Sequence, residues 1–534
     1  MASGEQEFDI VIVGAGSGGS AAAGRLSEGG KYSVCLIEPG GHNNYLQILA
    51  PAMLGQIPKK SNYMYETVPQ PGLNGRRGYQ PRGKGLGGSS AINAMVYIRG
   101  NKWDYDNWAA LGCDGWSYED VLPYFKRAEN NERGADQFHG SGGPLNVVDQ
   151  KWPNPGSLEW VEAAASLQLP RNADFNGEKQ EGVGLYQATQ KGGERWSASR
   201  AYVEPAIREG RLHVRTGARV ERITFDGKRA TGVVVKQGWR GEETIKARRA
   251  VILAAGAFNT PQLLMVSGIG PAAHLKQHGI NVLLDKPAVG SDLQDHIDYV
   301  AGYETGGDTF HGMSLKGQWR GFMALLEWRK HKSGWLTSPL AEAGGFAKTR
   351  PDVAIPDVQF HFVPAVLEDH GRTKVRVHGF SCHVCVLRPE SRGTVRLQSA
   401  RMADVPLIDP QFLADDRDVE TLLAGVKLTR RICEAPPLSG HNGTERHTRG
   451  VEDDATLIKT IRNRADTVYH PVGTARMGSD ADSVVDPQLR VRGVEGLYIA
   501  DASIMPRLIS GNTNAPSQMI GERAADFVTA DLAS

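Results

Sequence analysis

Residues 8–19 read FDIVIVGAGSGG, an apolar run that leads directly into three spaced glycines. Residues 10–13 are all apolar and β-branched, which is typical of a strand buried on both faces of a parallel sheet. The glycines fit G-x-G-x-x-G, in which one permits a tight turn, one lets the backbone approach a pyrophosphate and one lets helix and strand pack closely. They are Gly14, Gly16 and Gly19. The stretch therefore predicts a dinucleotide held at the N-terminus of the following helix.

A second predicted strand covers residues 33–38 and ends at Glu38, 19 residues after Gly19. An acidic side chain in this place accepts hydrogen bonds from ribose hydroxyls, and its charge repels a 2′-phosphate. The pattern therefore argues against a cofactor that carries a 2′-phosphate. It does not by itself distinguish NAD from FAD.

Length and composition narrow the class of protein. A chain of 534 residues exceeds a single typical core, so we expect two or more domains. A net charge of +1 gives no reason to expect a nucleic-acid partner. Five cysteines, an odd number, favour a reducing compartment without a disulfide framework. We expect neither a secretory signal nor a transmembrane segment and therefore a cytoplasmic protein, with peripheral contact to the inner membrane and oligomer formation left open.

Two further glycine-rich stretches indicate backbone that approaches a ligand. Residues 83–90 read GKGLGGSS and predict a helix that opens at Ser89 or Ser90. Farther along, we expect a strand over residues 250–255, a tight turn, and a helix with Thr260 as its N-cap and Pro261 at its first position.

These stretches carry a resemblance to a known family. Residues 82–100 and 254–270 are similar, over their whole spans, to the two signatures of the glucose–methanol–choline family of flavoproteins. Residues 289–296, 388–410 and 496–506 resemble other segments of that family, so the resemblance covers nearly the full chain. It implies an α/β fold with a doubly wound Rossmann-like FAD-binding domain, and an α+β substrate domain built on an antiparallel sheet.

The resemblance also implies FAD rather than NAD and suggests which residues hold it. They are Gly14, Gly16, Ser17, Gly19 and Glu38 at the adenosine diphosphate half, Gly87, Ser90, Asn93, Ala94 and Val96 along the flavin, Val220 at the adenine, Asp501 near the ribityl chain and pyrophosphate, and Asn512 near the isoalloxazine ring. Some relatives attach FAD through a histidine in the first signature. Residues 87–97 contain no histidine, so we expect non-covalent FAD. We expect no metal site.

Alcohol oxidation requires a base for the hydroxyl proton and an acceptor for the carbinol hydride, here flavin N5. A neutral imidazole suits the role of base because its ordinary pKa of about 6.5 lies near working pH. Residues 470–474, HPVGT, resemble the active-site pattern of the family and mark His470 as that base. Asn514 follows 44 residues later, where the family has His or Asn, so we expect its amide to hydrogen-bond the alkoxide as it forms.

The predicted FAD-binding domain is discontinuous and comprises residues 1–155, 200–300 and 455–534. The substrate domain comprises residues 156–199 and 301–454. The strands expected in its antiparallel sheet include residues 357–362, 375–387 and 394–397.

The predicted reaction is FAD-dependent oxidation of an alcohol, by default a primary aliphatic or aryl alcohol, to the aldehyde. The motifs favour a choline-dehydrogenase-like enzyme, but an oxidase stays open because the acceptor could be a quinone-like molecule or O2. Two alternatives from other classes also stay open, a hydroxynitrile lyase with a non-redox flavin and a flavin-binding protein without catalysis. His470 together with Asn514 speaks against both.

Overall fold

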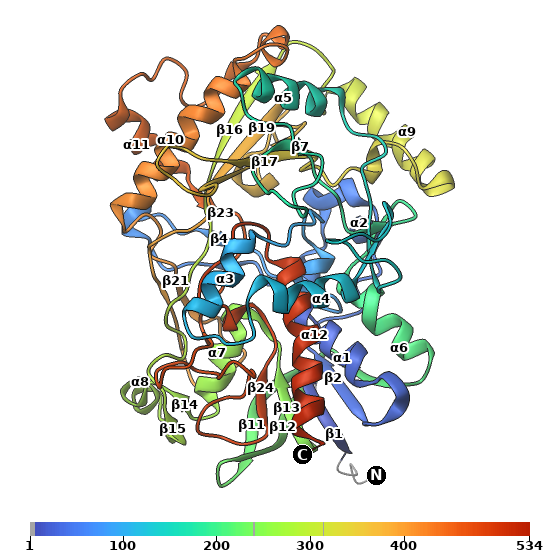
Figure 1. The fold of residues 1–534 in the computed structure, drawn as a ribbon, viewed down its shortest axis with the longest axis vertical. Coiled ribbons are helices and arrows are strands. Elements are labelled where there is room, and N and C mark those ends of the chain that lie inside the picture. The colour runs from blue at the N-terminus through green and yellow to red at the C-terminus, as the bar shows by residue number, and fades with distance from the viewer. Residues whose placement is uncertain (1–5, 239–240, 313, 534) are drawn as a thin grey trace.

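The computed structural model describes residues 6–238, 241–312 and 314–533, and it is organised around two large sheets. In Figure 1 the first sheet lies in the lower half of the view and the second in the upper half. This arrangement confirms the predicted fold class, an α/β cofactor-binding part joined to a second part built on an antiparallel sheet.

The first sheet has a parallel centre. Its strand order is β10 (Leu212–Thr216), β2 (Val34–Glu38), β1 (Gln6–Val13) and β13 (Glu242–Leu253), followed by the antiparallel strands β12 (Arg229–Gln237) and β11 (Ala218–Asp226). The late strand β24 (Leu497–Ile499) pairs in parallel with the C-terminal end of β13. Helices α1 (Ser17–Leu26) and α12 (Asn514–Asp531) pack side by side next to this sheet (Figure 1). The first and last parts of the chain therefore meet at the end of β1.

The second sheet is antiparallel throughout. Its order is β22 (Thr444–Glu445), β16 (Ile297–Thr305), β19 (His378–Val386), β18 (Val358–Val363), β17 (Ala343–Ala347) and β7 (Gly182–Leu185). Helices α5 (Pro155–Ser166) and α10 (Asp416–Cys433) cover one face, where the ring of Trp160 lies 5.9 Å from that of Phe362. Because successive strand residues face opposite sides, His361 on β18 faces away from that apolar layer.

Shorter elements complete the described part of the chain. The other helices are α2 (Leu46–Leu49), α3 (Lys102–Ala110), α4 (Tyr118–Ala128), α6 (Glu204–Arg208), α7 (Gly256–Val266), α8 (Ala272–Gln277), α9 (Leu315–His331) and α11 (Asp454–Arg464). Short strands form the pairs β3 (Tyr65–Glu66) with β4 (Tyr79–Gln80), β5 (Glu129–Asn131) with β6 (Leu145–Val147), β8 (Gln190–Lys191) with β9 (Glu194–Arg195), β14 (Ile269–Gly270) with β15 (Leu284–Asp285), and β20 (Thr394–Arg396) with β21 (Leu407–Asp409).

The start of α7 differs from the sequence prediction. The helix begins at Gly256 and not after Thr260, because Gly256, with φ of +84°, turns the chain out of β13 at once. Pro261 therefore lies inside the helix and cannot donate to the carbonyl of Ala257. The Thr474 hydroxyl donates to that carbonyl instead, at 2.6 Å. A long-range contact thus allows a proline that local rules would place at the helix start.

Two other predictions were wrong in their local detail. The glycine-rich stretch before Ile92 forms only a 3-10 turn, Gly88–Ala91, and no longer helix. The Ser90 hydroxyl does not cap a helix, since it donates to Gly87 O and accepts from Ala198 N. Residues 394–397 form no part of the second sheet, because β20 pairs only with β21.

The domain boundaries stay a prediction. One strand inside the range expected for the cofactor domain, β23 (Asp466–Thr467), pairs with β16 of the second sheet. The segment that follows β23 leads directly to His470, so the candidate base lies where the two sheets approach each other. In the described ranges, no helix combines the length and apolar content needed to cross a membrane.

Candidate active site

A cavity of about 1500 Å³ runs from the glycine turn after β1 to the open face of the second sheet. This volume exceeds the roughly 300–1,000 Å³ of sites for single small ligands. It therefore suits a dinucleotide together with a substrate. Of the residues expected at FAD, most line it, namely Gly14, Gly16, Ser17, Glu38, Asn93, Ala94, Val96, Val220, Asp501 and Asn512.

The three glycines of the turn have different surroundings. A Cβ atom added to Gly14 would lie 2.4 Å from the carbonyl oxygen of Ala254, and one added to Gly19 would lie 2.0 Å from that of Gly14. A Cβ atom on Gly16 would meet only the Ala254 oxygen, at 3.9 Å. The open space therefore lies at Gly16, where an approaching pyrophosphate needs it.

Two buried carboxylates hold the loops around this space. Glu38 accepts hydrogen bonds from the backbone N–H groups of Ala15, Gly40 and Gly85 at 3.1, 2.9 and 2.8 Å. Burial raises the pKa of Glu38, and these three donors oppose that rise. Because a carboxylate has about four acceptor sites, one remains for a ribose hydroxyl. The second carboxylate, Asp501, accepts from the N–H of Gly256, at the start of α7, at 2.9 Å.

Gly87 and Ser90 lie behind the cavity wall and not on it. Gly87 donates its backbone N–H to Ala15 O at 2.8 Å, and this bond ties the second glycine stretch to the first. Ser90 binds the backbone of Ala198, as described above. Gly87 and Ser90 therefore hold the shape of this loop, and two other residues of the same stretch, Ser89 and Asn93, border the cavity.

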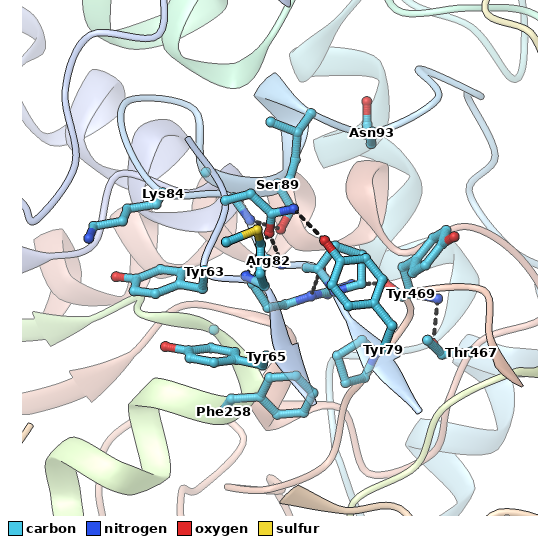
Figure 2. Close-up of a pocket in the computed structure, with 18 of the residues that line it drawn as sticks. Tyr63, Tyr65, Tyr79, Arg82, Lys84, Ser89, Asn93, Phe258, Thr467 and Tyr469 are labelled. Carbon is cyan, nitrogen blue, oxygen red and sulfur yellow. Dashed lines mark hydrogen bonds between the residues drawn. The ribbon is translucent and has the colours of Figure 1, made fainter. Parts of the chain in front are cut away.

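Aromatic side chains that the sequence did not point to form another wall. Figure 2 shows Tyr63, Tyr65 and Phe258 on one side of Arg82 and Tyr79 and Tyr469 on the other. The rings of Tyr63 and Tyr65 stack with centroids 5.0 Å apart, and Phe258 meets Tyr65 edge-on. This wall offers flat apolar surface to an aromatic ring system.

His470 lies at the other end of the cavity and is held from both sides. Its backbone N–H donates to Asp295 at 2.8 Å. Its Nδ1 lies 2.8 Å from Nδ1 of His296, whose Nε2 lies 3.0 and 3.1 Å from the carbonyl oxygens of Leu387 and Ile509. The role of His296 was missed from the sequence, although it directly follows Asp295 in the segment that resembles the family.

These contacts fix the tautomer of His470. Burial lowers the pKa of His296 to about 4, so this imidazole is neutral and carries one proton. Since its Nε2 faces two carbonyl acceptors, the proton sits there and Nδ1 of His296 accepts. His470 must then donate from Nδ1, which leaves Nε2 unprotonated, with a lone pair that can accept a hydrogen bond or a proton. Burial first, then His296, His361 and Arg82, hold the pKa of His470 well below its ordinary value, so it is poised as a neutral base.

The amide that faces this lone pair belongs to Asn512 and not to Asn514. Nδ2 of Asn512 lies 3.2 Å from Nε2 of His470, and its Oδ1 accepts from Gln359 at 3.1 Å, which fixes the direction of the amide. Asn514 is the first residue of α12 and accepts from the Ser17 hydroxyl at 2.7 Å. The structure therefore brings His470 together with Asn512, and it places Asn514 at the glycine turn.

The open face of the second sheet supplies the remaining wall. Val300, Leu340, Val363 and Leu367 make it partly apolar. A polar group interrupts this surface, since Nδ1 of His383 lies 2.6 Å from the buried carboxylate of Asp298. The other oxygen of Asp298 has no hydrogen-bond partner among the described residues. The cavity thus has apolar surface and unused hydrogen-bonding capacity on the same sheet.

Comparisons with known proteins show which family this chain resembles. Family models described as GMC oxidoreductase match residues 8–298 and 389–521. The chain is 43% identical to an alcohol dehydrogenase [acceptor] of Pseudomonas putida over 534 residues, 99% of this chain and 97% of the relative. It is 42% identical to an oxygen-dependent choline dehydrogenase of Brucella suis, over 98% of this chain and 95% of the relative. The crystal structure of pyridoxine 4-oxidase from Mesorbium loti superposes with a TM-score of 0.87 at 31% identity, over 97% of this chain and 98% of that one.

We predict that Gly16→Ala and Gly19→Ala separate cofactor binding from folding. In Gly16→Ala the added methyl group has room, so the apoprotein keeps its unfolding temperature, while FAD binds about tenfold or more weakly because its pyrophosphate is obstructed. In Gly19→Ala the methyl group overlaps the carbonyl of Gly14, so the apoprotein itself unfolds at lower temperature. Thermal unfolding and FAD titration of both variants would test this, and equal losses of stability would contradict it.

We also predict that His296→Ala lowers kcat by about 10–100-fold, the same order as the loss of a partner that orients a metal-binding imidazole. The cause is the freedom of His470 to change tautomer or rotate once its Nδ1–H has no acceptor. The FAD content should stay the same, because His296 is not among the residues that line the cavity. Steady-state kinetics on FAD-replete protein would measure the effect, and an unchanged kcat would refute the assigned tautomer.

Proposed function

The chain belongs to the GMC oxidoreductase family and is an FAD-dependent oxidoreductase that acts on CH–OH donors, and on this premise we propose that His470 is its catalytic base. The observation that carries the proposal is the unprotonated Nε2 of a buried, neutral His470, which borders the cavity and faces the amide of Asn512. The reaction is oxidation of an alcohol, which we propose to be a primary alcohol, to the aldehyde.

The residues present fit FAD. The open approach at Gly16, the remaining acceptor site of Glu38 and the N-terminus of α1 suit the adenosine diphosphate half. When bound, FAD supplies the hydride acceptor, flavin N5. We propose that the attachment is non-covalent, since residues 87–97 contain no histidine.

The proposed proton transfer uses three side chains. Nε2 of His470 takes the hydroxyl proton of the alcohol, while Nδ1–H stays bonded to His296 and keeps the ring in place. Asn512 turns its Nδ2–H toward the same point and donates to the substrate oxygen as negative charge develops. Because both groups are held in a buried site, they need little reorganisation when the charge forms.

The cavity wall limits the substrate. Val300, Leu340, Val363 and Leu367 suit an aliphatic or aryl group. His383 with Asp298 could hydrogen-bond a second polar group on that substrate. The proposed substrates are therefore primary alcohols with an apolar body, including those that carry a further hydroxyl group.

The electron acceptor is proposed from the relatives' names alone. One is named for an unspecified acceptor and the other for oxygen. We therefore propose either O2 or a quinone-like molecule as the acceptor. The cytoplasmic location and the oligomeric state stay predictions.

The decisive experiment mixes the FAD-replete protein anaerobically with benzyl alcohol, 1-alkanols, diols and choline, and follows the flavin band near 450 nm. We expect one class of alcohols to bleach the wild type, and His470→Ala to keep FAD but bleach about 10²–10⁴-fold more slowly. Admission of air then separates an oxidase from a dehydrogenase. Normal bleaching by His470→Ala would remove it from the role of base. Aldehyde release from mandelonitrile without bleaching would support the lyase alternative.

Asn512→Asp and Asn514→Asp form a matched pair, since each places a carboxylate on one of two nearby asparagines. Asn512→Asp should lower kcat/KM by about 10²–10³-fold, because its charge opposes the developing alkoxide. Asn514→Asp should change kcat of the FAD-loaded enzyme little and weaken FAD binding, because it adds charge beside the pyrophosphate end. The reverse order of effects on kcat would return the catalytic role to Asn514.

A further inference from the structure

Helix α9 lies at the edge of the upper part of the molecule in Figure 1. Several of its large apolar side chains are exposed to solvent. The exposed fractions are 87% for Leu315, 63% for Trp319, 52% for Phe322, 47% for Met323 and 46% for Leu326. Most other exposed large apolar residues of the described chain are scattered over different elements. A cluster of five on one helix marks an interaction surface.

The five residues form a continuous stripe. Relative to Leu315 they stand at positions 0, 4, 7, 8 and 11 of the helix, which share one face at 3.6 residues per turn. The rings of Trp319 and Phe322 lie 5.9 Å apart along it. The stripe therefore presents one apolar surface and not separate side chains.

The exposure does not come from a loosely attached helix. On the opposite face, Ala324 and Trp328 are buried against Ala50 and Leu336. The indole N–H of Trp328 donates to Gly193 O at 2.8 Å. The helix is thus anchored by one face, which fixes the apolar stripe toward solvent.

Basic side chains border the stripe. Arg329 and Lys330 extend it at the C-terminal end and are exposed, and Lys316 and Arg320 flank it near the other end. Acidic groups are fewer, namely Glu327 on the helix and Asp308, which pairs with Lys316 and Arg320. An apolar stripe with Trp and Phe, bordered by Arg and Lys, is the pattern of helices that lie in the interface of an anionic membrane.

A lipid surface fits this stripe better than a protein partner. Protein interfaces engage about 20–30 residues on each side, whereas here a single helix offers five apolar ones. We propose that α9 is a membrane-docking helix, which lies parallel to an anionic lipid surface with its stripe at the boundary of headgroups and acyl chains.

The position of α9 connects the docked surface to the cavity. The segment that packs against Trp328 includes Ala50 and Met53 and runs directly into Leu54, Gly55 and Ile57, which line the cavity. Docking by α9 would therefore bring this wall of the cavity close to the lipid surface, where apolar alcohols and apolar electron acceptors concentrate.

The test is sedimentation of the FAD-replete protein with phosphatidylcholine vesicles, prepared with and without phosphatidylglycerol. We expect the wild type to bind the anionic vesicles, and the double variant Trp319→Asp/Phe322→Asp to bind at least about tenfold more weakly. Arg329→Glu/Lys330→Glu should lose the preference for anionic vesicles. Leu158→Asp is the matched control, since Leu158 is a similarly exposed apolar residue on α5, and its binding should equal that of the wild type.

Turnover of a water-soluble alcohol with a soluble artificial acceptor should be the same for all these proteins, which checks that each is folded. The proposal is overturned if the wild type binds neither kind of vesicle, or if the double variant binds as tightly as the wild type. It is also overturned if light scattering shows a wild-type dimer that the double variant dissociates, because a second copy would then cover the stripe.

Discussion

The site depends on a single shared proton between two buried imidazoles. The facing Nδ1 atoms of His470 and His296 can hold only one hydrogen, and the carbonyls of Leu387 and Ile509 decide which ring donates. Leu387 directly follows β19 of the second sheet, and Ile509 belongs to the segment that leads to α12. The protonation of the candidate base therefore depends on parts of the chain that are correctly placed only when both sheets are docked.

The segment that carries His470 is also attached to the part of the molecule built on the first sheet. Thr474, four residues after His470, donates to the carbonyl that Pro261 leaves without a partner in α7. The N-terminal turn of α7 is in turn held by Asp501, whose carboxylate accepts from Gly256 and Thr260. A short chain of hydrogen bonds thus links the position of the base to the loop beside the pyrophosphate space, so the distance between the two functional ends is set by rigid backbone contacts.

Local pattern was sufficient for some features and insufficient for others. The glycine turn, β1 and β18 could be predicted because apolar runs and glycine spacing report burial and turn geometry directly. His470 was identified from its resemblance to a family pattern. The sequence analysis chose Asn514 as the partner of His470, whereas Asn512 is the residue that faces it. Sequence alone could not show this, because it depends on where α12 begins and on what Gln359 and Ser17 donate to. The contact of His296 with His470, and the Thr474 hydroxyl that allows Pro261 inside α7, likewise join residues more than 170 positions apart.

The contact between Ser17 and Asn514 spans 497 positions of the sequence. The strand β24 and the helix α12 complete the site, and both come several hundred residues after the glycine turn in the sequence. On a ribosome, where N-terminal segments emerge first, the glycine turn is exposed long before its C-terminal partners exist. A chain that has emerged only as far as the glycine turn therefore lacks the cavity residues that come later in the sequence, among them Asp501, Asn512 and Asn514.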